Sequence, residues 1–197
     1  MPSEEAPFGA SPVGPSRRQV LTGAGLLAVA GAAELVPLGD VEDWTPREDT
    51  WPLTRYDPAN TASTDAAPPT NPSVAWSDDT LGRQGRTALV VGPERVYAGG
   101  RGVLARSRAD GSEVWTHEDR PSGRLALREG TLYSGITEEI AGLDSDVLAA
   151  DAATGERGWG AGLPFEATSL LVADGGVFVG YDGGAAGFDA DTGVRRW

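Results

Sequence analysis

Tryptophan recurs along this chain at a spacing that constrains the fold more than any other feature. Four of the six tryptophans stand at positions 76, 115, 159 and 197, so consecutive members are 39, 44 and 38 residues apart. A period of about 40–45 residues is typical of a four-stranded propeller blade. The spacing therefore predicts an all-β chain of repeated blades.

Three stretches of sequence align around these tryptophans. They run from Leu89 to Trp115, from Leu125 to Trp159 and from Leu171 to Trp197. Short apolar runs such as 88–91 and 177–179 are bounded by Gly or Asp-Gly, as expected for buried strands between turns. We expect about three blades. Because a closed propeller needs about four or more blades, the ring is expected to be incomplete, either as the N-terminal part of a longer protein or as one of several short chains that assemble.

A turn motif precedes each of the last three tryptophans. The full copy reads Ala149-x-Asp151-x-x-Thr154-Gly155-x-x-x-Trp159. The Asp can accept turn N–H groups, the Gly can adopt a positive φ, and the Trp reaches the next strand, where its ring can fill the wedge between blades. The other two copies are Gly187, Asp189, Thr192, Gly193 and Trp197, and Ala105, Ser107, Asp110, Gly111 and Trp115.

This motif resembles the tryptophan-docking motif of the PQQ-like, quinoprotein-type repeat family. Members of that family are β-propellers of four-stranded blades, and the indole packs between neighbouring blades. The resemblance covers residues 51–197, and residues 51–61 resemble the segment that precedes the first blade. Within the family, the nearest functional label is the lipoprotein propeller that assists outer-membrane barrel assembly. The copy with Ser107 and Asp110 departs from the motif, which puts its docking in doubt.

The N-terminus has the pattern of an export signal. Arg17 and Arg18 stand before a weakly apolar run that reaches Ala33, which is too short to span a bilayer but suits a signal peptide. Paired arginines resemble a twin-arginine signal, and Ala30-Gly31-Ala32 offers a cleavage site. We expect a signal peptide at 1–33, a Pro/Asp/Thr-rich linker and lead-in segment at 34–71, and the repeats at 72–197. Cleavage would leave an extracytoplasmic protein with no stable membrane anchor.

The charge of the chain excludes one class of partner. There are 29 acidic residues against 16 basic residues, all of them arginine, and the net charge is −13. Such a surface repels nucleic acid. The composition resembles that of proteins from salt-loving archaea, where high salt screens the self-repulsion.

Residues that could carry chemistry are scarce. The chain has no Cys, and its one histidine, His117, reads as an ordinary strand residue. Asp144-Ser145-Asp146 begins like a calcium loop, but Ala149 stands where that loop needs Gly. We therefore predict no catalytic, cofactor-binding or metal-binding residue, and no cofactor.

Two functions follow as hypotheses. The first is an exported, non-enzymatic propeller that acts as a scaffold for a protein or cell-surface partner. The alternative is a PQQ-dependent quinoprotein dehydrogenase, in which PQQ and Ca²⁺ lie on the propeller axis, although no ligand of that site can be mapped onto this sequence. Fold analogy alone supports a cofactor, which is a weak argument.

Overall fold

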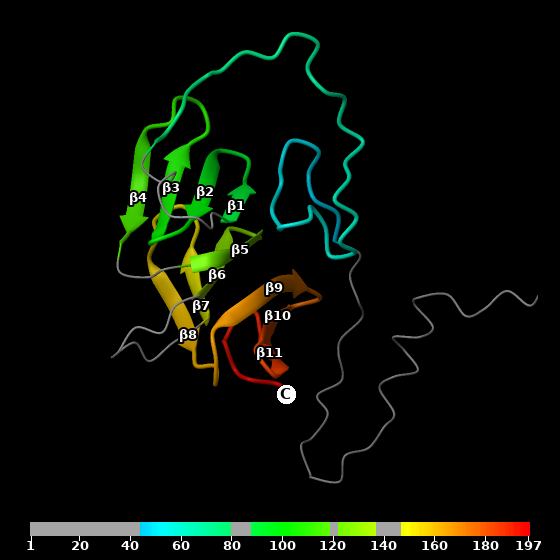
Figure 1. Ribbon diagram of the computed structural model, residues 1–197, viewed down its shortest axis with the longest axis vertical. Coiled ribbons are helices and arrows are strands. Elements are labelled where there is room, and N and C mark those ends of the chain that lie inside the picture. The colour runs from blue at the N-terminus through cyan, green and yellow to red at the C-terminus, as the bar shows by residue number, and fades with distance from the viewer. Residues whose placement is uncertain (1–43, 80–87, 119–121, 137–146) are drawn as a thin grey trace, which may run out of the picture. The chain divides into compact units, whose positions relative to one another are not determined.

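The computed structural model describes residues 44–79, 88–118, 122–136 and 147–197. Within these ranges the secondary structure consists of eleven strands in three antiparallel sheets, without a helix (Figure 1). The described part of the chain accordingly contains no helix that is long and apolar enough to cross a membrane. The all-β class predicted from the tryptophan spacing is confirmed.

Each sheet is an up-and-down meander, and consecutive strands are neighbours in it. Blade 1 consists of β1 (Ala88–Val91), β2 (Arg95–Gly99), β3 (Val103–Ser107) and β4 (Glu113–His117). Blade 2 consists of β5 (Ser122–Arg128), β6 (Thr131–Ile136), β7 (Val147–Asp151) and β8 (Arg157–Ala161). Blade 3 consists of β9 (Ala167–Ala173), β10 (Gly176–Tyr181) and β11 (Gly184–Asp189).

The last three residues occupy the position of a fourth strand in blade 3. Arg195 forms an isolated antiparallel bridge with Phe188, and the Arg196 amide donates to the Gly187 carbonyl over 2.7 Å. The third aligned stretch therefore forms the same kind of sheet as the first two, as the repeat predicted.

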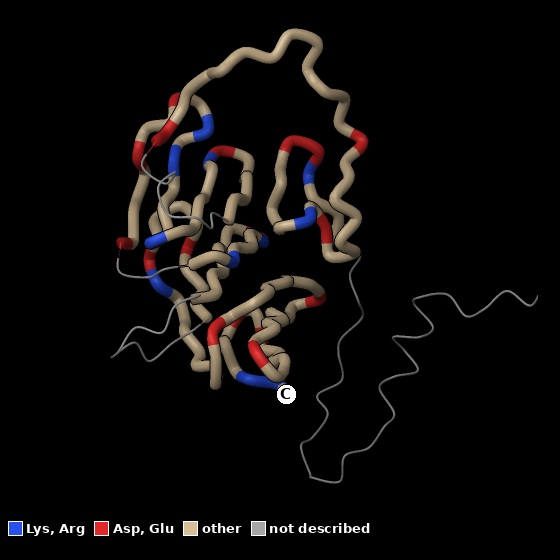
Figure 2. The backbone as a smooth tube through the Cα atoms, viewed as in Figure 1, with Lys and Arg blue, Asp and Glu red and all other residues tan. Residues whose placement is uncertain are grey.

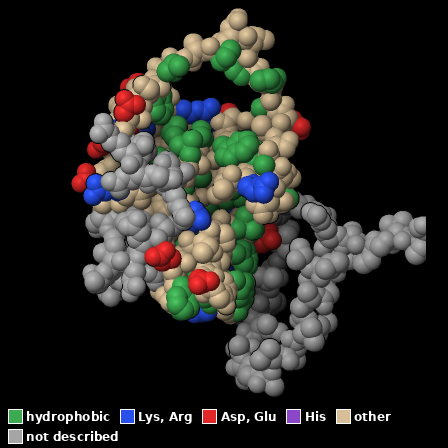
Figure 3. Space-filling view, in the orientation of Figure 1, with side chains coloured by type: hydrophobic (Ala, Val, Ile, Leu, Met, Phe, Trp, Pro, Cys, Tyr) green, Lys and Arg blue, Asp and Glu red, His purple; other side chains and the backbone are tan. Residues whose placement is uncertain are grey.

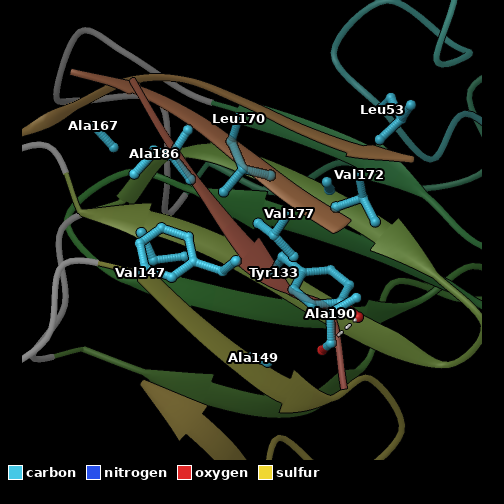
Figure 4. Packing of buried hydrophobic residues seen from close by; sticks show 13 residues of the cluster. Leu53, Tyr133, Val147, Ala149, Ala167, Leu170, Val172, Val177, Ala186 and Ala190 are labelled. Atoms are coloured by element: carbon cyan, nitrogen blue, oxygen red, sulfur yellow. Dashed lines mark hydrogen bonds between the residues drawn. The ribbon is translucent and has the colours of Figure 1, made fainter. Parts of the chain in front are cut away.

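Period-two alternation places the two faces of blade 2 in different cores. Leu125 and Leu127 pack with Val90 of blade 1, whereas Ala126 packs with Phe188 of blade 3. Figure 4 shows the second of these cores, in which small and branched side chains of blades 2 and 3 interdigitate. Successive strand residues point to opposite faces of a sheet, so a strand buried on both faces reads as a continuous apolar run. The first strand of each blade contacts the first strand of the next: β1 contacts β5, and β5 contacts β9. These three inner strands therefore lie on the side of the blades that faces the propeller axis.

Strand β1 departs from the prediction of a fully buried strand. Val90 is buried against blade 2, but Leu89, which points to the opposite face, is 53 % exposed. An apolar run shows that a strand can be buried on both faces, but it does not show that a neighbouring blade is present on each side. The face of blade 1 that carries Leu89 has no neighbouring blade among the described residues.

The lead-in segment, defined here as residues 44–62, packs against the blades. Trp51 and Val91 exchange two backbone hydrogen bonds of 2.8 Å, and the Leu127 amide donates to the Pro52 carbonyl. Leu53 is buried in the core between blades 2 and 3, and Tyr56 is also buried. The aromatic residues Trp51 and Tyr56 thus belong to a segment that packs against the blades.

Charged and apolar side chains are distributed differently over the surface. Acidic residues lie mainly at turns and strand ends (Figure 2). On the face shown in Figure 3, hydrophobic side chains gather toward the middle and charged side chains surround them. Where such exposed charged groups form ion pairs, those pairs contribute little to the stability of the fold.

Candidate functional site: the docking turns and the axial cavity

The turn between β7 and β8 is closed by the carboxylate of Asp151. Its Oδ1 accepts hydrogen bonds from the Ala153 amide at 2.9 Å, the Thr154 amide at 2.7 Å and the Thr154 hydroxyl at 3.0 Å. The Thr154 amide is the main cause of the lowered pKa of Asp151. Gly155 then takes a φ of +76°, a conformation that glycine adopts without a steric penalty.

The turn that follows β11 repeats this geometry. Asp189 Oδ1 accepts from the Thr192 amide and hydroxyl at 2.9 and 2.8 Å, and Gly193 has a φ of +70°. The Arg196 guanidinium donates to Asp189 Oδ2 over 2.5 Å. That bond, followed by the bond from the Thr192 hydroxyl, lowers the pKa of Asp189 to about 2.

Trp159 of blade 2 docks on this turn of blade 3. Its indole Nε1 donates to the Ala190 carbonyl over 2.8 Å, and its ring lies so close to Gly193 that a Cβ there would be 2.5 Å from two ring carbons. The same carbonyl accepts a second bond from the hydroxyl of Tyr133 at 3.3 Å, the dashed line in Figure 4. Tyr133 and Trp159 are neighbours, with ring centroids 6.0 Å apart.

Blade 1 docks on blade 2 in the same way. Trp115 Nε1 and the Tyr97 hydroxyl both donate to the Ala152 carbonyl, at 3.1 and 3.0 Å, and the Trp115 ring covers Gly155. Burial raises the pKa of Tyr97, so the phenol stays a donor near neutral pH. His117 lies on β4, as expected, and its Nε2 is 2.8 Å from the Gly155 carbonyl. These tyrosine and histidine contacts are not part of the motif seen in the sequence.

The degenerate turn of blade 1 also receives a tryptophan. The Trp76 ring covers Gly111, whose φ is +74°, and Trp76 Nε1 donates to the Arg108 carbonyl over 3.0 Å. Asp110 replaces the missing turn aspartate, and hydrogen bonds from Ser107 and Ser112 lower its pKa to about 2. Trp76 is the first of the four regularly spaced tryptophans, but no turn motif precedes it. The sequence therefore did not identify it as a docking residue.

Small residues of the motif leave space for each indole within its own blade. Ala105 pairs directly across from Trp115, and Ala149 pairs across from Trp159. In blade 3 the equivalent residue is Gly187, and a Cβ there would be 2.6 Å from the Trp197 ring. The substitution of Gly for Ala is therefore matched by a closer approach of the ring.

Trp197 is the last of the predicted docking residues, and it covers no turn of another blade among the described residues. It is 57 % exposed and packs on Phe178, with ring centroids 6.1 Å apart. This pair repeats the Tyr97–Trp115 and Tyr133–Trp159 pairs of the other blades. The export residues Arg17 and Arg18 and the acidic stretch 144–146 lie outside the described residues.

A cavity of about 850 Å³ opens at the axis, beside the inner strands. Its lining includes Arg55 and Asn60 of the lead-in segment, Arg124 of β5 and Ser169 of β9. The Arg124 guanidinium is held by the carbonyls of Gly123 and Thr168. None of the described residues that line the cavity is an Asp or Glu.

The described residues that line the axial cavity do not fit the PQQ–Ca²⁺ pair of the quinoprotein enzymes. Ca²⁺ takes about six to eight oxygen ligands, usually with carboxylates among them, and the described lining of the axial cavity supplies none. Elsewhere in the described ranges, no three His, Asp or Glu side chains lie close enough together to hold a metal ion.

The geometry defines a class of protein, namely a β-propeller whose blades are joined by docked tryptophans. A family model described as outer membrane protein assembly factor BamB matches residues 99–197. That match extends over half of the sequence, so the chain belongs to this family of PQQ-like propeller repeats. No curated protein matches the sequence significantly.

Solved structures share the fold. A europium-containing methanol dehydrogenase matches 77 % of this chain at 18 % identity with a TM-score of 0.58, and a quinohemoprotein alcohol dehydrogenase from Pseudomonas putida HK5 matches 76 % at 17 % identity with a TM-score of 0.52. The chain spans only 32 % and 26 % of those two structures. The computationally designed Ika4 protein matches over 57 % of this chain and 71 % of its own length, at 20 % identity and a TM-score of 0.50. At these identities the likeness establishes the fold alone.

Proposed function

We propose that this chain is an exported, non-enzymatic propeller that acts as a binding scaffold for a protein or cell-surface partner. One observation carries the proposal: the motif residues are engaged in joining blades. Asp151 and Thr154 close a turn, Gly155 receives an indole, and Trp159 binds a carbonyl of the next blade. Membership of a family whose model is described as an outer membrane protein assembly factor supports a role in protein interaction.

The rival function is a PQQ-dependent dehydrogenase, and a titration separates the two. PQQ is added to the purified chain in molar KCl with Ca²⁺ present, and quinone absorbance and reduction of a redox dye with simple alcohols and aldoses are followed. We expect neither binding nor dye reduction, because the residues that the structure describes around the cavity include no carboxylate to hold Ca²⁺. Stoichiometric binding together with dye reduction would contradict the scaffold function.

Export through a twin-arginine signal is the second part of the proposal, together with the division into a signal peptide at 1–33, a linker and lead-in segment at 34–71 and repeats at 72–197. The paired Arg17 and Arg18 before an apolar run support it. Replacing both with Lys should leave the protein inside the cell, because the signal is identified by its arginine pair. Cell fractionation measures the outcome, and normal secretion of the double variant would exclude this route.

The acidic composition supports function in concentrated salt, which is the reason for molar KCl in the titration. With a net charge of −13, the folded chain repels itself at low ionic strength. At about 1 M salt the screening length falls to about 3 Å, so this repulsion is largely removed.

A further inference from the structure

The lead-in segment adds a short stretch of chain to the inner edges of blades 1 and 2. The inner strands β1, β5 and β9 each stand at the end of their sheet, so one edge of each has no partner strand within its own blade. Trp51 exchanges two backbone hydrogen bonds of 2.8 Å with Val91 of β1, and the Pro52 carbonyl accepts the Leu127 amide of β5. The inner edge of a blade can therefore bind an added segment through its main chain.

The inner edge of blade 3 carries no such segment within the described part of the chain. Residues 168–171 of β9 all line the axial cavity, although successive side chains of a strand point to opposite faces of its sheet, so the edge itself faces the cavity. Among the described residues, no backbone hydrogen bond from outside blade 3 reaches these four residues. Because neighbouring blades pack face to face, a further blade would cover a face of blade 3 and leave this edge on the axis.

A β-bulge at the start of this edge holds an arginine. The register between β9 and β10 shifts between Gly180 and Tyr181, and Thr168 is the extra residue on β9. The extra residue of a bulge is left unpaired in the ladder. The Thr168 carbonyl accepts a hydrogen bond from Nε of Arg124, and Nη1 of Arg124 donates to the Gly123 carbonyl over 2.7 Å. The guanidinium is thereby held beside the free edge, in the lining of the cavity.

A second arginine lines the same cavity from the lead-in segment. The Arg55 carbonyl accepts the amides of Asp57 and Ala62 at 2.9 and 3.0 Å, which closes a compact loop. Buried Tyr56 has a φ of +74°, a conformation that a bulky residue takes only where its surroundings impose it. The Asp57 carboxylate accepts the amide and hydroxyl of Thr61 at 2.9 and 2.6 Å and does not line the cavity. The loop therefore presents Arg55 to the cavity without its acidic neighbour.

The cavity is cationic although the chain is strongly acidic. The whole chain has a net charge of −13, whereas the described lining contains Arg55 and Arg124 and no Asp or Glu. A guanidinium binds a carboxylate through two parallel hydrogen bonds. Exposed ion pairs alone contribute little, above all in molar salt. A carboxylate is therefore retained here only where the main chain that carries it also bonds to β9.

We propose that the free edge of β9 binds an extended, acidic segment of a partner protein. The segment adds as a further strand along residues 168–171, and its carboxylates pair with Arg124 and Arg55. Main-chain hydrogen bonds supply the affinity, and the two arginines select acidic side chains. This inference rests on the proposed scaffold function and names the kind of partner that one of its surfaces accepts.

Fluorescence anisotropy of a short labelled peptide of alternating Glu and Val, titrated with the whole chain in molar KCl, tests the proposal. We expect saturable binding. The same peptide with Gln in place of each Glu should bind about tenfold more weakly, because it loses the charge-assisted hydrogen bonds. The Glu peptide methylated at its backbone nitrogens should not bind, because it cannot pair with the edge of β9.

Variants of the chain locate the site. Arg124→Gln and Arg55→Gln should each weaken the binding about fivefold or more, because each removes a charged partner of a carboxylate. Arg55 is exposed, so its replacement leaves the fold intact even if Arg124→Gln disturbs the contact between β5 and β9. Arg101→Gln is the matched control, because Arg101 is exposed on the turn between β2 and β3 and does not line this cavity. Denaturant melts show that each variant remains folded.

Four results would each overturn the proposal. They are no saturable binding up to millimolar concentration, equal affinity for the Gln peptide, equal affinity for the methylated peptide, and equal losses for Arg101→Gln and Arg55→Gln. Absence of peptide binding would remove this site but leave the scaffold function, which fails only on PQQ binding with dye reduction in the titration described above.

Discussion

Replacing Trp159 with alanine is expected to lower the free energy of unfolding by about 3–5 kcal/mol, as for other large aromatic side chains in cores. The indole fills the wedge between blades 2 and 3, where it contacts Gly193 and donates to the Ala190 carbonyl. Its removal leaves a void and deprives that carbonyl of the shorter of its two hydrogen bonds, since the Tyr133 bond is 3.3 Å long.

Trp197→Ala provides the internal comparison. Trp197 holds the same motif position but covers no turn of another blade among the described residues and is 57 % exposed. Its loss should cost less than about 1 kcal/mol. Urea melts measure both values. A loss below about 1 kcal/mol for Trp159→Ala would mean that the motif tryptophan does not hold blades together.

Gly193→Ala is expected to destabilise the protein through two separate effects. The positive φ of +70° disfavours any side chain by about 1–2 kcal/mol. In addition, the new Cβ would lie 2.5 Å from two carbons of the Trp159 ring, so the indole has to move. Overpacking of this kind costs a further 1–3 kcal/mol or so.

Gly175 allows the two effects to be measured apart. It lies in the same blade with a similar φ of +65°, but a Cβ there meets no atom within 4 Å. Gly175→Ala should therefore show the backbone cost alone, and Gly193→Ala should exceed it by the cost of displacing the ring. Equal losses in urea melts would show that docking tolerates a methyl group and that the turn glycine is needed only for its conformation.

The sequence predicted the repeat because each turn motif and the tryptophan that follows it are local in the chain. The turn from Asp151 to Gly155 is closed by its own residues, and Trp159 follows on the next strand, so residue type and spacing were enough. Many strand runs also end at a turn that contains glycine, but the boundary between β4 and β5 is not marked in this way, because residues 118–121 contain no glycine.

The partners of these residues could not be predicted, because they are distant in sequence. Trp76 contacts Gly111 and Arg108 across more than thirty residues, and it stands in a Pro-rich stretch without a turn of its own. Tyr97 and Tyr133 donate to carbonyls of the next blade, a role that their shared position before Gly99 and Gly135 could have suggested. The exposure of Leu89 depends on which blades are present, which an apolar run does not encode.

The central claim is that the motif tryptophan and the glycine of the following blade form one contact. A double-mutant cycle with Trp159→Ala and Gly193→Ala measures this contact directly. Without the indole, a Cβ at 193 has no ring to displace, so the double variant should lose about 1–3 kcal/mol less than the sum of the single losses. Losses that add to within about 0.5 kcal/mol would contradict the claim, because residues that do not touch behave independently.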